Sequence, residues 1–175
     1  MSSAATFSAL TACDLMEIER QESQLMWLGQ SGEVDPQTAL ALAGEANGQT
    51  VRGPDGRILA CYGIHETFPG HQGVAWALLA EDLGPHYTAI ARAMRRMIAQ
   101  SGLARIELFA RSHDVPQDFM AIEPFDTSMS VALVMVKPTP ECRLAQLVGC
   151  EPVHVLRRFG GGDETYMLCE WIAAA

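Results

Sequence analysis

The chain has 175 residues, of which 49% are apolar and 19% are charged. This composition excludes an intrinsically disordered chain, and the length is enough to bury one hydrophobic core without disulfides or metals. The net charge of −9 argues against nucleic acids and anionic membranes as partners, because both bind basic surfaces. No apolar run reaches the roughly 20 residues that span a bilayer. The first 20 residues lack a basic segment followed by an apolar one, so we expect no signal peptide.

The cysteines predict reduced, mostly buried thiols in a cytosolic protein. Their number is odd and no two are spaced as C-x-x-C, which argues against a disulfide framework and against a cysteine zinc site. The five are Cys13, Cys61, Cys142, Cys150 and Cys169.

Two helices are predicted near the N-terminus. Asp14 followed by Glu17 has the spacing of a capping box, and apolar residues at helical spacing continue this first helix to Gly29. The second helix begins at Asp35-Pro36, because aspartate caps a helix well and proline fits its first turn. We expect it to end at Gly48.

Three strands are expected to follow. Thr50–Arg52 and Ile58–Glu66 flank the turn Gly53–Gly56, and together they predict an antiparallel hairpin. The proline and glycines of Thr67–Gly73 predict a loop. Val74–Ala80 is apolar at every position, which is typical of a strand buried on both faces.

The clearest helix begins after Gly84-Pro85 and ends before Gly102. With the strand predicted at Ala104–Arg111, it completes a β-α-β unit, whose crossover should be right-handed. Three arginines lie outside its apolar stripe and predict a solvated face, or else an anchor for an acidic partner or for a nucleotide 3′-phosphate. They are Arg92, Arg95 and Arg96.

The C-terminal part begins with an insertion, predicted as a loop over about 112–130. Ser130–Val136 is a further strand candidate, and Pro140–Val148 is predicted to form a short helix. Val153–Phe159 and Thr165–Ile172 predict a last hairpin. The order predicts one α+β domain over residues 1–175, with a mixed, mostly antiparallel sheet flanked by helices.

Three stretches resemble the GNAT N-acetyltransferase superfamily, and more narrowly a tailed-phage and prophage branch of virion-associated acetyltransferase-like proteins. Asp14–Arg20 resembles the opening helix of that branch. Ile58–Ile64 with Gly73–Leu79 resembles its hairpin, and Leu83–Arg96 resembles the helix that follows. The resemblance implies a GNAT-like sheet, a phage or host protein as partner, and a location in the host cytoplasm or the virion.

The resemblance also implies acetyl-CoA as the cofactor. Its pyrophosphate would sit on backbone N–H groups of a loop similar to [RQ]-x-x-G-x-[GA], and its pantetheine arm would run beside the preceding strand. This sequence keeps Gly84 but has Glu81 and His86 at the other two positions, and Pro85 contributes no N–H. The cofactor-binding residues implied in this way are Leu78, Leu79, Ala80, Gly84, His86 and Tyr87.

The residues that carry out catalysis in many members of the superfamily are not all recognisable here. Those enzymes use a glutamate as general base and a tyrosine on the later short helix as general acid, but this short helix contains no tyrosine. Candidate bases are Glu66, His65 and Glu81, and Cys142 is an alternative proton donor. His65, Glu66 and His71 do not have the spacing of a metal motif, so we expect no metal.

Two functional hypotheses follow. The first is a phage or prophage GNAT-fold protein with weakened or lost acetyl-CoA chemistry, acting as a virion-associated or host-interaction module. The alternative is an active acetyl-CoA-dependent N-acetyltransferase with an atypical pyrophosphate loop. In either case we expect a homodimer, because the uncharged apolar run Val131–Val136, read as a strand, would invite association at an open sheet edge. The alternative is that this run pairs inside the sheet of a monomer.

Overall fold

A seven-stranded sheet is the centre of the computed structural model, which describes residues 4–21, 24, 26–27, 30–31, 34–45, 47–114, 127–159 and 164–174. Its spatial order is β1-β4-β5-β6-β7-β9-β8, and every neighbouring pair is antiparallel except β6 and β7. The predicted α+β class and the parallel β-α-β unit are confirmed. The strands are β1 (Thr6–Ala9), β4 (Gln49–Arg52), β5 (Ile58–Phe68), β6 (Gln72–Leu79), β7 (Arg105–Arg111), β8 (Glu151–Phe159) and β9 (Glu164–Ile172).

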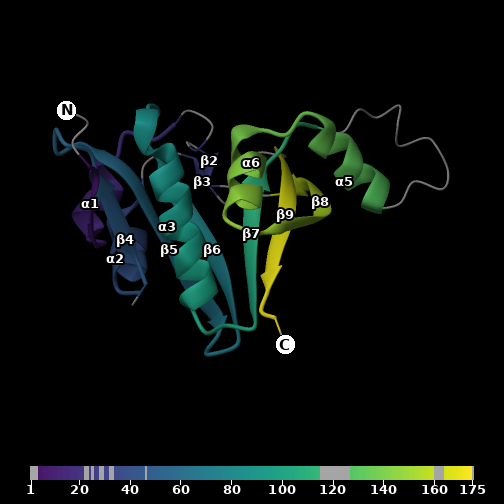
Figure 1. The fold of residues 1–175 in the computed structure, drawn as a ribbon, viewed down its shortest axis with the longest axis horizontal. Helices are drawn as coiled ribbons and strands as arrows, with labels where there is room; N and C mark the ends of the chain where they lie inside the picture. The colour runs from purple at the N-terminus through teal and green to yellow at the C-terminus, as the bar shows by residue number, and fades with distance from the viewer. Residues whose placement is uncertain are drawn as a thin grey trace.

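Helices cover both faces of the sheet (Figure 1). None of the described helices is both long and apolar enough to cross a bilayer. The helices are α1 (Ala12–Glu17), α2 (Pro36–Ala43), α3 (Tyr87–Gln100), α5 (Thr127–Val136) and α6 (Pro140–Leu147). The smaller elements are the 3₁₀ turn η2 (Gly84–His86) and a two-stranded ribbon of β2 (Met26–Trp27) and β3 (Gln30–Ser31).

The two layers of helices follow from the alternation of side chains along β5. Ala60, Tyr62 and Ile64 pack into the core formed with α3 and α6, whereas Cys61, between the first two, packs into a second core with α1 and α2. Successive residues of a strand point to opposite faces, so one strand supplies both cores. In α3, Ile90 and Met94 belong to the apolar stripe that is buried against the sheet, as predicted.

The first helix differs from its prediction at both ends. Its N-cap is Thr11, and Asp14 is the third residue of the helix, which closes the capping box, rather than the cap itself. The helix ends at Glu17, since Ile18 already has an extended backbone. Of the apolar positions that were expected to continue the helix, Met26 belongs to β2, and Leu25 lies outside the described residues. A helical period alone could not reveal the stop at Glu17.

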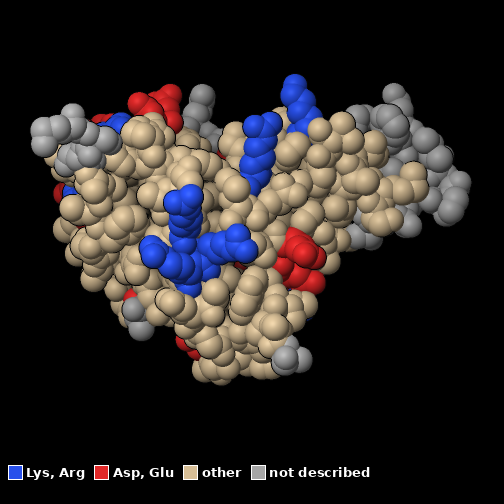
Figure 2. All heavy atoms as spheres, viewed as in Figure 1, with Lys and Arg blue, Asp and Glu red and all other residues tan. Residues whose placement is uncertain are grey.

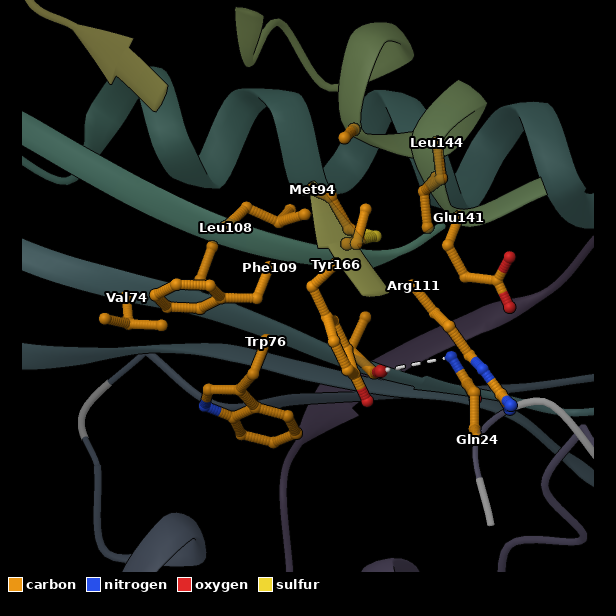
Figure 3. A pocket seen from close by; sticks show the side chains of 14 residues that line it. Gln24, Val74, Trp76, Met94, Leu108, Phe109, Arg111, Glu141, Leu144 and Tyr166 are labelled. Carbon is orange, nitrogen blue, oxygen red and sulfur yellow. Dashed lines mark hydrogen bonds between the residues drawn. The ribbon is translucent and has the colours of Figure 1, made fainter. Parts of the chain in front are cut away.

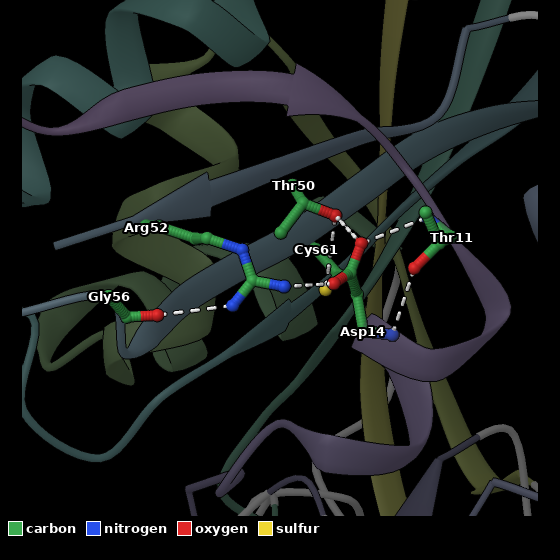
Figure 4. Close-up of polar contacts among 6 residues, drawn as sticks. All are labelled: Thr11, Asp14, Thr50, Arg52, Gly56 and Cys61. Carbon is green, nitrogen blue, oxygen red and sulfur yellow. Dashed lines mark hydrogen bonds and ion pairs between the residues drawn. The ribbon is translucent and has the colours of Figure 1, made fainter.

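The carboxylate of Asp14 links α1 to β4 (Figure 4). Its Oδ2 accepts hydrogen bonds from the Thr50 hydroxyl at 2.7 Å and from the Thr11 N–H at 2.9 Å. Its Oδ1 forms an ion pair with Arg52. A buried charge needs partners of this kind, so the site determines how the N-terminal helix docks on the sheet.

The helix predicted at Asp35-Pro36 is confirmed, with Asp35 as its N-cap, although it ends at Ala43 rather than at Gly48. The predicted hairpins and the α6 helix are also confirmed. The predicted loop at 67–73 is shorter, because β5 continues to Phe68 and β6 begins at Gln72. Strand β1 was not predicted, since all four of its residues are exposed and show no alternation.

The strand predicted at Ser130–Val136 is wrong, because these residues belong to helix α5. Val134 is 6% exposed and Val136 is 83% exposed, although a strand would place both on one face. A short apolar run does not distinguish a strand from a helix. Of the predicted insertion, 115–126 lies outside the described residues and 127–130 is the start of α5. The homodimer was expected because a strand at this place would need a covering subunit, and a helix removes that argument. The homodimer therefore stays a prediction.

Candidate active site

Strands β6 and β7 separate part-way along their length. They pair from Gln72 opposite Arg105 to Ala75 opposite Leu108, and beyond this point no pairing continues. A cavity of about 80 Å³ lies where they diverge, large enough for a few water molecules. We call this cavity the passage.

The passage is lined from both faces of the sheet (Figure 3). Met94 of α3 and Leu144 of α6 line it on one face. Trp76 of β6 and Tyr166 of β9 line it as well, and Trp76 belongs to the core on the other face. The cavity therefore lies within the sheet, between the two layers of helices.

Tyr166 is one of the polar residues that line the passage. It is 5% exposed, it stands opposite Arg111 in the register of β9 and β7, and its ring packs edge-on against Phe159 at 5.5 Å. Burial raises the pKa of Tyr166, the nearby Glu164 raises it further, and Arg111 only partly opposes them. The phenol therefore stays protonated at neutral pH and can donate a proton.

Glu141 supplies a carboxylate to the passage from the first turn of α6. Its Oε1 is buried and has no hydrogen-bond partner among the described residues. In Figure 3 the side chains of Glu141, Arg111 and Gln24 lie on one side of Tyr166, and that of Trp76 lies on the other. An unpartnered buried acceptor is costly, so it marks a place where a donor group of a ligand would be stabilised.

Trp76 is packed against β5 because Gly63 stands opposite it. A Cβ atom on Gly63 would lie 2.9 Å from the indole ring, closer than side chains approach. The indole Nε1–H donates to Glu45 Oε2 at 3.4 Å, which ties the ring to the end of α2. The glycine thus fixes one wall of the passage.

The loop before α3 uses its own backbone donors. The N–H of Gly84 donates to Asp82 Oδ1 at 2.9 Å, and the N–H of His86 donates to the Leu83 carbonyl at 3.0 Å. Pro85, between them, has no N–H. The carboxylates of Glu81 and Asp82 are both exposed at this loop. None of the three residues of η2 therefore offers an unengaged N–H for an anion.

Comparisons with known proteins show which solved structures share this fold. No protein-family model and no curated protein matches the sequence, but solved structures match it over nearly its whole length. An aminoglycoside 6′-N-acetyltransferase complexed with coenzyme A superposes with a TM-score of 0.67 at 14% identity, covering 97% of this chain and 98% of that one.

A spermidine N-acetyltransferase from Vibrio cholerae, in complex with CoA and spermine, gives a TM-score of 0.57 at 11% identity and covers 96% of this chain and 95% of its own. The fold is that of the GNAT acetyltransferases. Identities this low show the GNAT fold alone, and none of the neighbours named here points to the phage branch.

The candidate bases lie elsewhere in this GNAT fold. His65 Nδ1 lies 2.6 Å from Glu45 Oε1, and Glu66 Oε2 accepts the N–H of Gly70 in the β5–β6 turn. Glu81 is exposed in the loop before α3. None of His65, Glu66 and Glu81 lines the passage, and their catalytic role stays a prediction. Cys142 is buried and its thiol donates to the Arg111 carbonyl at 3.6 Å.

The residues implied to bind the cofactor form two groups. Leu79 and Ala80 follow the point where β6 leaves β7, whereas the side chain of Leu78 packs into the core with α1 and α2. Gly84 and His86 belong to η2. Tyr87 begins α3 and is half-buried. These residues lie along the end of β6 and the start of α3, and their binding role stays a prediction.

Sequence reasoning missed Tyr166, Glu141 and Arg111, which come from three separate elements. In the sequence, each of these residues is marked only by being a polar residue within or beside an apolar run. Many surface residues show the same pattern. Among the described residues, no group of three or more His, Cys, Asp or Glu side chains is placed to hold a metal ion.

The three arginines of α3 form a cationic patch on the exposed face of the helix (Figure 2). No ion pair joins Arg92, Arg95 or Arg96 to an acid among the described residues. The predicted solvated face is therefore observed, whereas its role as an anchor stays a prediction.

Proposed function

We propose that this protein is an acetyl-CoA-dependent N-acetyltransferase that acts on an amine. The observation that carries the proposal is the passage, which is lined from both faces of the sheet where β6 and β7 diverge. Transfer of an acetyl group needs a thioester and an amine held end to end, and a passage through a sheet can hold them so. The GNAT fold and the CoA complexes of two structural neighbours support this reading.

Acetyl-CoA supplies an activated acetyl group when it is bound. The apolar walls of Met94, Leu108 and Leu144 exclude water from the reacting centre. The Glu141 carboxylate accepts a hydrogen bond from the incoming amine and takes its proton. With acetyl-CoA bound, Tyr166 would be the proton donor for the departing thiolate, because its hydroxyl lines the passage and stays protonated.

The residues fit the two ends of this cofactor differently. The narrow passage suits a thin chain ending in a thioester. The loop before α3 suits a pyrophosphate poorly, because its N–H groups are engaged and two carboxylates stand beside them. We therefore expect an affinity for acetyl-CoA below that of a loop with unengaged donors.

The engaged loop also favours a second candidate function: a GNAT-fold interaction module with weakened or lost acetyl-CoA chemistry. A phage or virion setting belongs to this second proposal. Glu81→Arg distinguishes the two, because it replaces repulsion of a phosphate by attraction. Tighter acetyl-CoA binding by this variant at low salt favours the enzyme, and an unchanged affinity favours the module.

The direct test of the enzyme is thermal unfolding with and without acetyl-CoA, followed by an assay of CoA release with a panel of amines. Ligand at 100 times its dissociation constant adds about 2.7 kcal/mol to the free energy of unfolding. Tyr166→Phe should lower kcat about 100-fold without changing the dissociation constant for acetyl-CoA. Tyr62→Phe is the matched control, because it removes a buried hydroxyl that does not line the passage. An unchanged melting temperature at millimolar acetyl-CoA would exclude the enzyme.

A further inference from the structure

Two glutamines cover the edge of β6 that β7 leaves open. The side-chain Oε1 of Gln24 accepts a hydrogen bond from the Leu79 N–H at 2.7 Å, and its Nε2 donates to the Ala77 carbonyl at 3.4 Å. The backbone N–H of Gln21 donates to the Leu79 carbonyl at 3.0 Å. The Gln24 carboxamide and the Gln21 backbone thus take the place of a neighbouring strand.

This edge faces the passage. The N–H of Ala80 donates to the Leu59 carbonyl of β5, so the backbone groups of Leu79 point the other way, toward the side of β7. The side chain of Gln24 is itself one of the groups that line the passage. In Figure 3 the Gln24 side chain lies in the same part of the passage as that of Arg111.

The contact has a physical cause and a consequence. Backbone groups at a partly buried sheet edge need partners, and β7 no longer supplies them beyond Ala75. The Leu79 N–H can make only one good hydrogen bond. A ligand chain lying along this edge therefore cannot use Leu79 while Gln24 does. An amide-bearing chain could take over both bonds, since its N–H and C=O match the carboxamide that it displaces.

We propose that Gln24 is an internal competitor of acetyl-CoA, and that its side chain must leave Leu79 and Ala77 before the cofactor enters the passage. This inference rests on the proposed function. Because only the displaced form binds, the measured affinity is reduced by the fraction of molecules in which Gln24 is displaced. Gln24 thereby determines cofactor affinity without taking part in the chemistry.

The experiment compares acetyl-CoA dissociation constants by calorimetry for the parent, Gln24→Ala and Gln24→Asn. Asn keeps a carboxamide but is one methylene shorter, so it loses the reach to Leu79 while changing the fold least. We expect about five- to tenfold tighter binding by Gln24→Ala, and a smaller gain by Gln24→Asn. Gln37→Ala, at an exposed position of α2, is the matched control and should bind as the parent does.

Hydrogen exchange at the Leu79 amide gives a readout without turnover. The Leu79 amide should be protected in the ligand-free parent and exchange faster in ligand-free Gln24→Ala. Adding acetyl-CoA to Gln24→Ala should protect this amide again. Equal or weaker binding by Gln24→Ala would overturn this inference and leave the proposed function intact. Absence of binding by the parent and by both variants at millimolar acetyl-CoA would overturn the proposed function, and this inference with it.

Discussion

At the scale of single residues, Asp14 is a carboxylate whose surroundings determine its charge. Burial acts to raise the pKa of Asp14, but the hydrogen bonds from Thr50 and Thr11, with the Arg52 guanidinium, outweigh it and hold the pKa below the usual 3.8. A lowered pKa in the folded state means that the charged form stabilises the fold. This contribution is complete above the unfolded-state pKa and is lost as the pH falls through the folded-state pKa.

We expect Asp14→Asn to lower the free energy of unfolding by about 2 kcal/mol at pH 7. The value is below the roughly 3–5 kcal/mol typical of a fully buried ion pair, because the Arg52 side chain is 36% exposed and water screens it. Urea unfolding at pH 7, 5, 4 and 3 checks this, and the gap between parent and variant should close below pH 4. A gap that stays constant down to pH 3 would contradict this prediction, because it would show that folding does not lower the pKa of Asp14.

The thiols differ in reactivity because they differ in burial. Burial raises the pKa of Cys61 and Cys169 to about 12 and that of Cys150 to about 11, and it also raises the pKa of Cys142. Cys13 alone is exposed. We expect a disulfide reagent at pH 8 to modify one thiol quickly, and Cys13→Ser to abolish that phase. Unfolded protein should react at all five thiols. A second fast thiol in the native parent would contradict the burial described here.

At the scale of elements, α5 can be tested by two substitutions only two residues apart. Val134→Asp places a charge in the core and should lower the free energy of unfolding by about 3 kcal/mol. Val136→Asp, at an exposed position, should change it by less than about 0.5 kcal/mol. Chemical unfolding of both variants is the measurement. Two equally destabilising changes would favour a strand, because a strand places both residues on one face.

The ends of α1 and α2 show why the lengths of elements were hard to predict. Both helices were predicted to be several residues longer, because suitable residues continue beyond Ile18 and beyond Ala43. Helices this short are stabilised by packing and capping rather than by propensity. Their ends therefore depend on where the sheet stops covering them, and the spacing of apolar residues does not record that.

At the scale of the whole molecule, charge is unevenly distributed. The chain carries 21 acidic and 12 basic residues, yet three arginines gather on α3 (Figure 2). We expect the lowest solubility near pH 4.9, where the net charge vanishes and no longer keeps molecules apart. Turbidity between pH 4 and 8 at constant ionic strength checks this. A solubility minimum near neutral pH, seen as a maximum of turbidity, would indicate association through a specific patch instead.

The sequence by itself determined the α+β class, both hairpins, the amphipathic α3 and the parallel β-α-β unit. Each of these depends on periodicity and turn residues, which are local properties of the chain. It also indicated the GNAT fold, through short motifs around β5, β6 and α3.

Only the tertiary structure decided the rest. In the folded protein the apolar run that ends at Val136 is helical, and Asp14 finds its partners on β4. The tertiary structure also brought Gln24, Glu141 and Tyr166 to one passage from three distant parts of the chain. The passage exists because two parallel strands separate, and no local pattern encodes where that separation begins. It depends on how α3, α6 and β9 pack around the two strands, which is a property of the folded molecule as a whole.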